Sequence, residues 1–161
     1  MASTGRRRFL VGAAAAPLAC LARPDRAGAT DYASAADVLD TIDRRAADVD
    51  ARLAAIARAV PGAQAFADSV GADHARHRAQ RERLRRRLKV AASAPPTPPE
   101  KADLSLAALR EAQQQLVQAH AVGLPVLGDG GAGDLLARHM VDASRHLTVI
   151  DLWLEAEEQR G

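Results

Sequence analysis

Two copies of a short acid–histidine motif are the feature of this 161-residue chain that is best suited to chemistry. Asp73-x-x-x-His77 and Asp142-x-x-x-His146 each place a carboxylate four residues before an imidazole. On a helix this spacing puts both side chains on one face, one turn apart. Imidazole and carboxylate together are ligands for zinc, copper, iron or manganese. The two motifs therefore predict a transition-metal site.

Two further histidines extend this candidate site. If the second and fourth helices begin at the same end of the molecule, His77 and His146 lie at about the same height. His120 and His139 then lie near a second level, whereas His74 is expected to face outward. The predicted ligands are Asp73, His77, Asp142 and His146, with His120 and His139 as auxiliary ligands.

A simpler interpretation of the same residues stays open. Asp73 can bond His77 of its own motif as a buried pair, which would fix the imidazole tautomer and satisfy both groups. His139 and His146 lie just beside the apolar stripe of their segment, so they also suit half-exposed flank positions.

The elements that must position these side chains are helices. The composition is 48% hydrophobic but only 2% aromatic, which favours helices over an all-β fold. Segments of helical length span about 34–60, 63–89, 103–122 and 134–158, with a proline-rich linker at about 90–102 between the second and third. Short loops favour antiparallel neighbours, so we predict one all-α domain, an antiparallel up-down four-helix bundle.

The apolar pattern differs among the four segments. The first has an unbroken stripe whose members, such as Leu39 and Ile42, are alternately three and four residues apart. The second and third stripes are interrupted by polar residues, among them Arg81 and Gln113. The interruptions indicate that the interior of the bundle contains polar groups.

The helix ends carry their own signals. Ser34, Asp103 and Asp134 can accept hydrogen bonds from unpaired backbone amides at the starts of the first, third and fourth helices. Pro125 is expected to end or kink the third helix, because it lacks a backbone donor.

A run of basic residues closes the second segment, from Arg76 to Lys89. Cations suit the carboxyl end of a helix because of its macrodipole. With 22 basic against 20 acidic residues and few aromatic side chains to stack on bases, nucleic acid is not an expected partner. The acids expected at the same end of the bundle are Asp31, Asp37, Asp40, Glu155, Glu157 and Glu158.

Residues 1–29 have the composition of a targeting segment. A twin-arginine pair precedes an apolar stretch, 9–22, which is shorter than the roughly 20 residues that span a bilayer. A small-x-small site follows, and the whole resembles a Tat signal peptide. The resemblance implies the Tat export machinery as a partner, a periplasmic location, and a mature bundle at 30–161 with no stable membrane insertion after cleavage. The residues that carry it are Arg6, Arg7, Phe9, Leu10, Ala27 and Ala29.

The single cysteine offers an alternative at this end of the chain. Pro17-Leu18-Ala19-Cys20 partly resembles a lipobox, which would give a lipid-anchored product, and a short amphipathic N-terminal helix is a third interpretation. One cysteine excludes a disulfide framework and a thiolate cluster. The absence of CxxCH excludes covalent c-type haem.

The predicted helices, the long link between the second and third, and the motifs on the second and fourth resemble the ferritin-like superfamily. Ala65-Phe66-Ala67 before Asp73-His74 is also similar to exported ferritin-like families of unknown function. The resemblance implies that His77 and His146 are the two histidine ligands, with Asp73 and Asp142 as the paired acids. The family spacing is Glu-x-x-His, and its further glutamates have no clear counterpart here.

Together these features predict an exported helical bundle that binds iron, manganese, zinc or copper without being an enzyme. The alternatives are a di-metal oxidase or peroxidase-like enzyme and a metal-free structural or interaction module. The sequence leaves the metal, the oligomeric state and any further partner undetermined.

Overall fold

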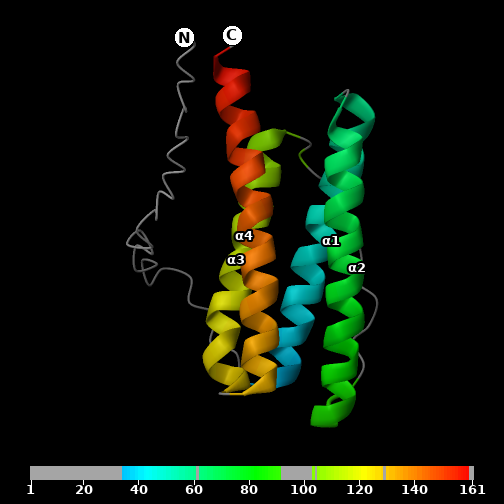
Figure 1. The fold of residues 1–161 in the computed structure, drawn as a ribbon, viewed down its shortest axis with the longest axis vertical. Coiled ribbons are helices and arrows are strands. Elements are labelled where there is room, and N and C mark those ends of the chain that lie inside the picture. Colours follow the sequence, from blue (N-terminus) through cyan, green and yellow to red (C-terminus); the bar gives the residue numbers. More distant parts are fainter. Residues whose placement is uncertain (1–33, 61, 92–102, 104, 129, 160–161) are drawn as a thin grey trace, which may run out of the picture.

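Four α-helices form the part of the chain that the computed structural model describes, which is 34–60, 62–91, 103, 105–128 and 130–159. No strand occurs among these residues, so the predicted all-α bundle is confirmed (Figure 1). The signal-peptide prediction for 1–29, Cys20 and most of the linker lie outside the described residues. The helices are α1 (Ala35–Ala59), α2 (Ala63–Leu88), α3 (Leu106–Leu127) and α4 (Gly131–Glu158).

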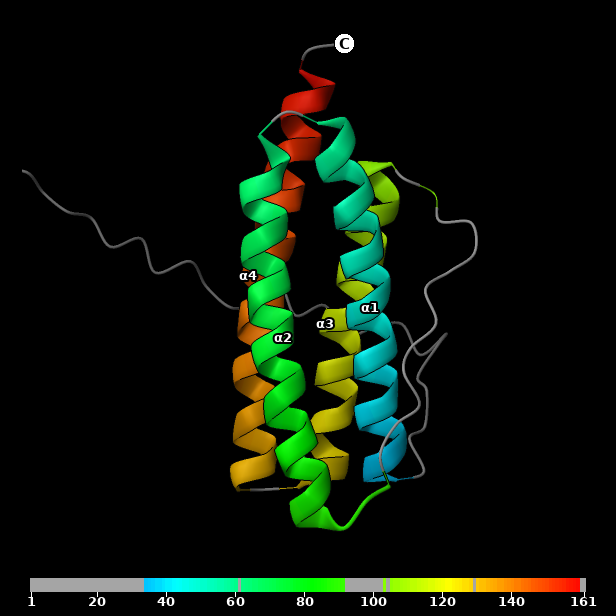
Figure 2. The same cartoon turned by 90° about the vertical axis from the view of Figure 1, so that its right-hand side faces the viewer.

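Neighbouring helices in the bundle are antiparallel. The consecutive helices α2 and α3 are not neighbours but lie diagonally opposite each other and are parallel. α1 packs against α2 and α3, and α4 packs against α3 and α2 (Figure 2). Arg52, near the end of α1, donates from Nη1 to the backbone oxygen of Asp103 at 2.7 Å, so α3 begins beside the end of α1. α2 and α3 therefore run in the same direction, as in bundles with one long crossover connection. This order is compatible with a ferritin-like fold.

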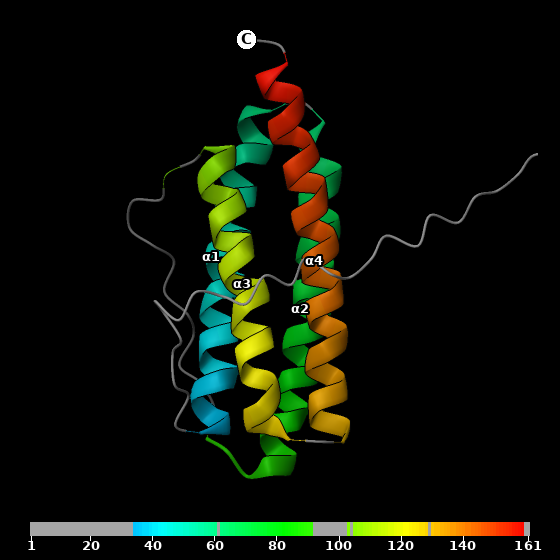
Figure 3. The ribbon, with the colours of Figure 1, turned by 90° about the vertical axis from the view of Figure 1, so that its left-hand side faces the viewer.

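The expectation that α2 and α4 begin at the same end is wrong. α2 starts at the end of the bundle where α4 finishes, so Glu155, Glu157 and Glu158 lie far from the basic end of α2 (Figure 3). The length of the linker between α2 and α3 did not determine whether α3 runs parallel or antiparallel to α2. A 13-residue linker reaches about 43 Å when extended, and a 26-residue helix is about 39 Å long. Both a short turn and a full crossover were therefore compatible with the linker.

The apolar core is concentrated where α1 and α3 meet. The α1 stripe predicted from the sequence is buried, and α3 supplies Leu109 and Leu116 to the same core. Gly123 of α3 lies against α1 so closely that an added Cβ would come within 2.5 Å of Val38 Cγ1. The small residue allows the two backbones to approach.

The helix ends confirm one of the three predicted caps. Ser34 accepts from the Asp37 amide at 3.3 Å, but α3 is capped by Ser105 and α4 by Gly130, with Asp134 in its first turn. α3 continues two residues past Pro125, because a proline in the last turn removes only one backbone hydrogen bond. Among the described helices, none combines the length and apolar character needed to cross a bilayer.

Candidate metal centre

The interface of α2 with α4 is built from polar side chains that bridge a wide separation between the two backbones. His77 Nε2 lies 3.1 Å from Asp142 Oδ2, and His146 Nε2 lies 3.2 Å from Asp73 Oδ2. Each motif therefore pairs with the other motif and not with itself. This exchange follows from the antiparallel direction of α2 and α4, which brings the acid of one motif level with the histidine of the other. The alternative in which Asp73 bonds His77 of its own motif is wrong.

All five histidines are buried, which corrects two expectations about individual side chains. His74, expected to face outward, is only 5% exposed, and its Nδ1 lies 2.6 Å from Asp50 Oδ1 of α1. His139 and His146, compatible with flank positions in the sequence, are 2% and 8% exposed. The seam beside α2 is wide enough to admit these rings, so positions next to the apolar stripe also face inward.

The histidines fall into two groups along the bundle axis. The upper histidine pair consists of His74 and His146, whose ring centroids are 5.9 Å apart. The lower histidine group consists of His77 and His139, stacked at 3.9 Å, and His120, at 6.1 Å from His139. The predicted ligands His77 and His146 thus belong to different groups.

Four of the five imidazoles share one unusual pattern, in which one ring nitrogen is hydrogen-bonded and the other is buried without a partner. Besides the Asp50 and Asp73 contacts of the upper pair, His120 Nδ1 bonds the Leu116 carbonyl at 2.8 Å and His139 Nε2 bonds Gln80 Oε1 at 2.7 Å. Metal-binding histidines commonly have this arrangement, with an oxygen behind the ring and the second nitrogen free for the ion. The unpartnered atoms are His74 Nε2, His146 Nδ1, His120 Nε2 and His139 Nδ1.

The lower histidine group has an electropositive environment. Burial, and to a smaller extent the nearby Arg81 guanidinium, lower the pKa of His77 and of His120 to about 4 and that of His139 to about 2. Burial also lowers the pKa of Arg81, which nevertheless stays charged because Asp43 stabilises it. The lower rings are therefore neutral near pH 7, but a cation placed among them would be repelled by Arg81.

The upper histidine pair has acidic surroundings instead. Burial raises the pKa of Asp73, but Arg76 and the bonded His146 lower it more, so the carboxylate is ionised. Burial and the neighbouring His74 lower the pKa of His146, against the opposing effect of Asp73. Both rings of the upper pair have a carboxylate behind them, whereas in the lower group only His77 does, from Asp142. Imidazoles backed by carboxylates suit a cation.

Sequence reasoning missed a buried ion network below the lower group. Arg81 donates from Nε and Nη2 to Asp43 Oδ1, at 2.9 and 2.6 Å, and Arg85 donates from Nη2 to Asp43 Oδ2 at 3.0 Å. Arg85 also contacts Asp40 at 2.7 Å, as the predicted packing of the basic run beside α1 requires. Asp43 follows Leu39 by four residues on the buried face of α1, and this spacing could have identified it.

The structure separates the six predicted ligands into two roles. His77, His120, His139 and His146 have inward-facing rings, whereas Asp73 and Asp142 lie behind imidazoles and also contact Arg76. Among the described residues, no group of three or more histidine, cysteine or acidic side chains is arranged to hold a metal ion. Known protein families, curated proteins and solved structures gave no match to the chain.

Proposed function

We propose that the upper histidine pair binds one transition-metal ion between α2 and α4. The observation that carries the proposal is the pair of buried, unpartnered nitrogens, His74 Nε2 and His146 Nδ1, whose opposite ring nitrogens contact Asp50 and Asp73. The ring centroids are 5.9 Å apart, and an ion with bonds of about 2 Å to each nitrogen fits between rings at that spacing. Imidazole nitrogen suits zinc, copper, iron or nickel.

Two protein ligands leave coordination positions open, and this favours an ion that can be exchanged. A closed structural site needs about four protein ligands. We propose a metal-binding bundle that is not an enzyme. His120 and His139, proposed as auxiliary ligands from the sequence, lie next to Arg81, which disfavours a second cation there.

The geometry offers less support for a di-metal oxidase. Such a centre needs carboxylates that can bridge two ions. Asp73 and Asp142 are each engaged by a histidine and by Arg76, and Asp43 is engaged by Arg81 and Arg85. Releasing Asp43 would leave two buried arginines without their partner, which is energetically costly.

Metal titration of purified, metal-free protein tests the proposal. Copper, zinc and cobalt would each be titrated into the wild type and into His74→Ala/His146→Ala, with the bound metal measured by elemental analysis. We expect the double variant to lose at least about 100-fold in affinity for the preferred ion, and Asp73→Asn alone to lose about 10-fold.

Two controls show whether such a loss is specific. Val70→Ala shortens a buried side chain of the same helix without removing a donor, and should leave the affinity unchanged. His120→Ala/His139→Ala removes two imidazoles from the lower group and should have little effect. If this lower double variant loses as much affinity as the upper one, or if the wild type binds none of the three metals, the assignment is wrong.

We also propose that the chain is a Tat-exported member of the ferritin-like superfamily. The crossover order of the four helices supports the superfamily, and the composition of 1–29 supports the route. Replacement of Arg6 and Arg7 by lysine should leave the protein unprocessed in the cytoplasm. The mass of the mature N-terminus distinguishes cleavage after Ala29 from lipid attachment at Cys20, and export of the Lys–Lys variant at the normal rate would rule out the Tat route.

A further inference from the structure

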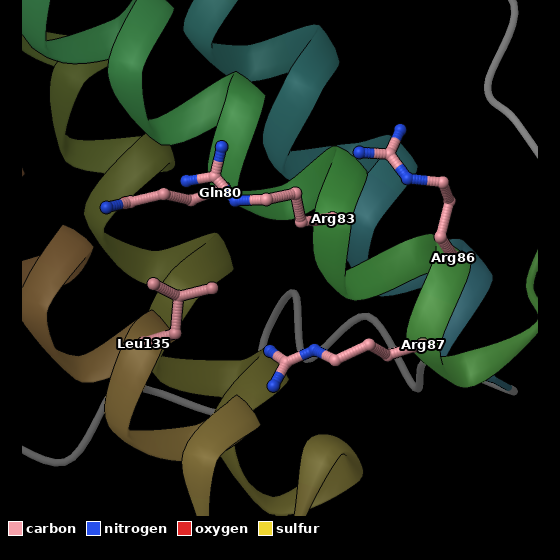
Figure 4. Close-up of a pocket in the computed structure, with 5 residues that line it drawn as sticks. All are labelled: Gln80, Arg83, Arg86, Arg87 and Leu135. Atoms are coloured by element: carbon pink, nitrogen blue, oxygen red, sulfur yellow. The ribbon is translucent and has the colours of Figure 1, made fainter.

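A pocket at the basic end of α2 is the strongest feature that the proposed metal site does not use. It has a volume of about 730 Å³, within the range of small-molecule sites. Arginines from the last turns of α2 form one side, and Leu135 of α4 lies across from them (Figure 4). The lining residues are Gln80, Arg83, Arg86, Arg87 and Leu135.

The positive charge in this pocket is not neutralised by the described part of the chain. Arg83 and Arg87 have no ion-pair partner among the described residues, and Arg86 has only an exposed contact with Glu82 at 3.7 Å. The buried Arg81 and Arg85 on the same helix, in contrast, are both bonded to Asp43. A helix macrodipole explains why cations suit this end of α2, but it does not explain why three of them line a pocket.

The placement of Arg83 and Arg87 suits a ligand with more than one anionic group. They are four residues apart on one helix, so their Cβ atoms are about 6 Å apart on the same face. Figure 4 shows both guanidinium groups on the side of α2 that faces Leu135, with Arg86 turned away. Guanidinium forks match carboxylate and phosphate oxygens, and the half-buried Leu135 supplies an apolar surface for a carbon skeleton.

We propose that this basic pocket binds a small anion carrying two or more carboxylate or phosphate groups, held by Arg83 and Arg87 beside Gln80. Gln80 also connects the pocket to the bundle interior through a hydrogen bond. Its Oε1 accepts the hydrogen bond of His139 Nε2 at 2.7 Å, so its amide nitrogen is left to donate to a ligand. Ligand binding in the pocket should therefore change the environment of the His139 ring.

Calorimetric titration of the metal-free protein tests the pocket independently of the metal site. Citrate and pyrophosphate are the multivalent probes, and acetate and inorganic phosphate are the smaller ones. We expect a multivalent probe to bind at least about tenfold more tightly than its smaller counterpart, and Arg83→Gln/Arg87→Gln to weaken it by at least about tenfold. Whether citrate or pyrophosphate binds better identifies the preferred anionic group.

A matched variant distinguishes binding in the pocket from nonspecific electrostatic attraction to the protein. Arg45→Gln/Arg58→Gln removes the same charge from two exposed arginines of α1 outside the pocket. This variant should bind within about twofold of the wild type, since exposed distant charges are screened by salt. Equal weakening by both double variants, or no preference for the multivalent probes, would overturn the proposal.

The link between the pocket and His139 through Gln80 can be measured separately. Histidine side-chain NMR should show the His139 nitrogen signals shifting as citrate is added to the wild type. The shift should be lost in Gln80→Leu, which has no amide to bridge the ligand and the ring. A shift that persists in Gln80→Leu would contradict the role given to Gln80.

Discussion

The α1–α3 interface and the α2–α4 interface of this bundle are held together by different forces. Where α1 meets α3 the contact is apolar, and a glycine at position 123 brings the backbones close together. Where α2 meets α4 the backbones stay farther apart, and histidine, aspartate and glutamine side chains fill the seam.

This difference indicates that the α1–α3 interface mainly stabilises the fold, whereas the α2–α4 interface supplies groups that can bind a ligand. Burial of apolar surface stabilises α1 and α3 without any need for exact hydrogen-bond partners. The polar seam gains little net energy from each hydrogen bond, and it leaves imidazole nitrogens unsatisfied. Buried polar atoms without a partner are candidates to bind a ligand, and the proposed metal site uses two of them.

The largest expected effect comes from removing the carboxylate that holds α2 to α1. Asp43→Ala leaves Arg81 and Arg85 buried without their shared partner, and should lower the free energy of unfolding by about 3–5 kcal/mol. Denaturant unfolding monitored by circular dichroism measures it. Asp40→Ala is the control, because its 41% exposed side chain should contribute no more than about 1 kcal/mol. Equal losses in the two variants would show that burial of the ion network is not the cause.

Two glycines test the contrast in packing directly. Gly123→Ala should cost about 1–3 kcal/mol, because the new methyl group meets Val38 Cγ1 at 2.5 Å. Gly71→Ala in α2 meets nothing within 4 Å and should instead stabilise the helix by roughly 1 kcal/mol. Thermal unfolding measures both effects, and changes in stability of opposite sign would confirm that the two helices pack differently. Recovery of stability in Gly123→Ala/Val38→Ala would identify the methyl contact as the cause.

Acid should destabilise the metal-free protein through the polar interior. In the folded state the pKa of His77 and of His120 is about 4, below the ordinary value of 6.5, so the unfolded chain holds more protons between these values. Stability should therefore rise with pH from about 4 to 6.5, by about 1 kcal/mol per pH unit for each histidine, and level off above. Denaturant midpoints across this range measure the slope. His120→Gln should reduce it, and a flat profile below pH 6 would contradict the pKa shifts.

The smallest expected effect is the coupling between the two motifs. A double-mutant cycle on Asp73 and His146 should give about 0.5–1 kcal/mol in the metal-free protein, because the pair is only partly buried. The same cycle on Asp73 and His77, which do not bond each other, should give a value near zero. A larger coupling within the motif than between the motifs would contradict the pairing of Asp73 with His146.

Much of the architecture was predictable because it depends on local patterns. The stripe through Leu39 and Ile42 predicted a buried face, and the four helices lie close to their expected bounds. Ser34 was identified as a cap because it bonds a backbone amide only three residues away. The inward direction of His74 was not predictable, since it depends on Asp50 of another helix and on the width of the seam beside α2.

The amino-acid sequence by itself determined the number of helices, the apolar stripe of α1 and the two acid–histidine motifs, because periodicity and spacing fix which residues share a helix face. Only the tertiary structure decided which partners those faces meet. The crossover between α2 and α3 sets the direction of α4, and this direction makes Asp73 bond His146 and Asp142 bond His77. Spacing within one helix is the same for either direction, so contacts between helices are fixed only when the whole chain has packed.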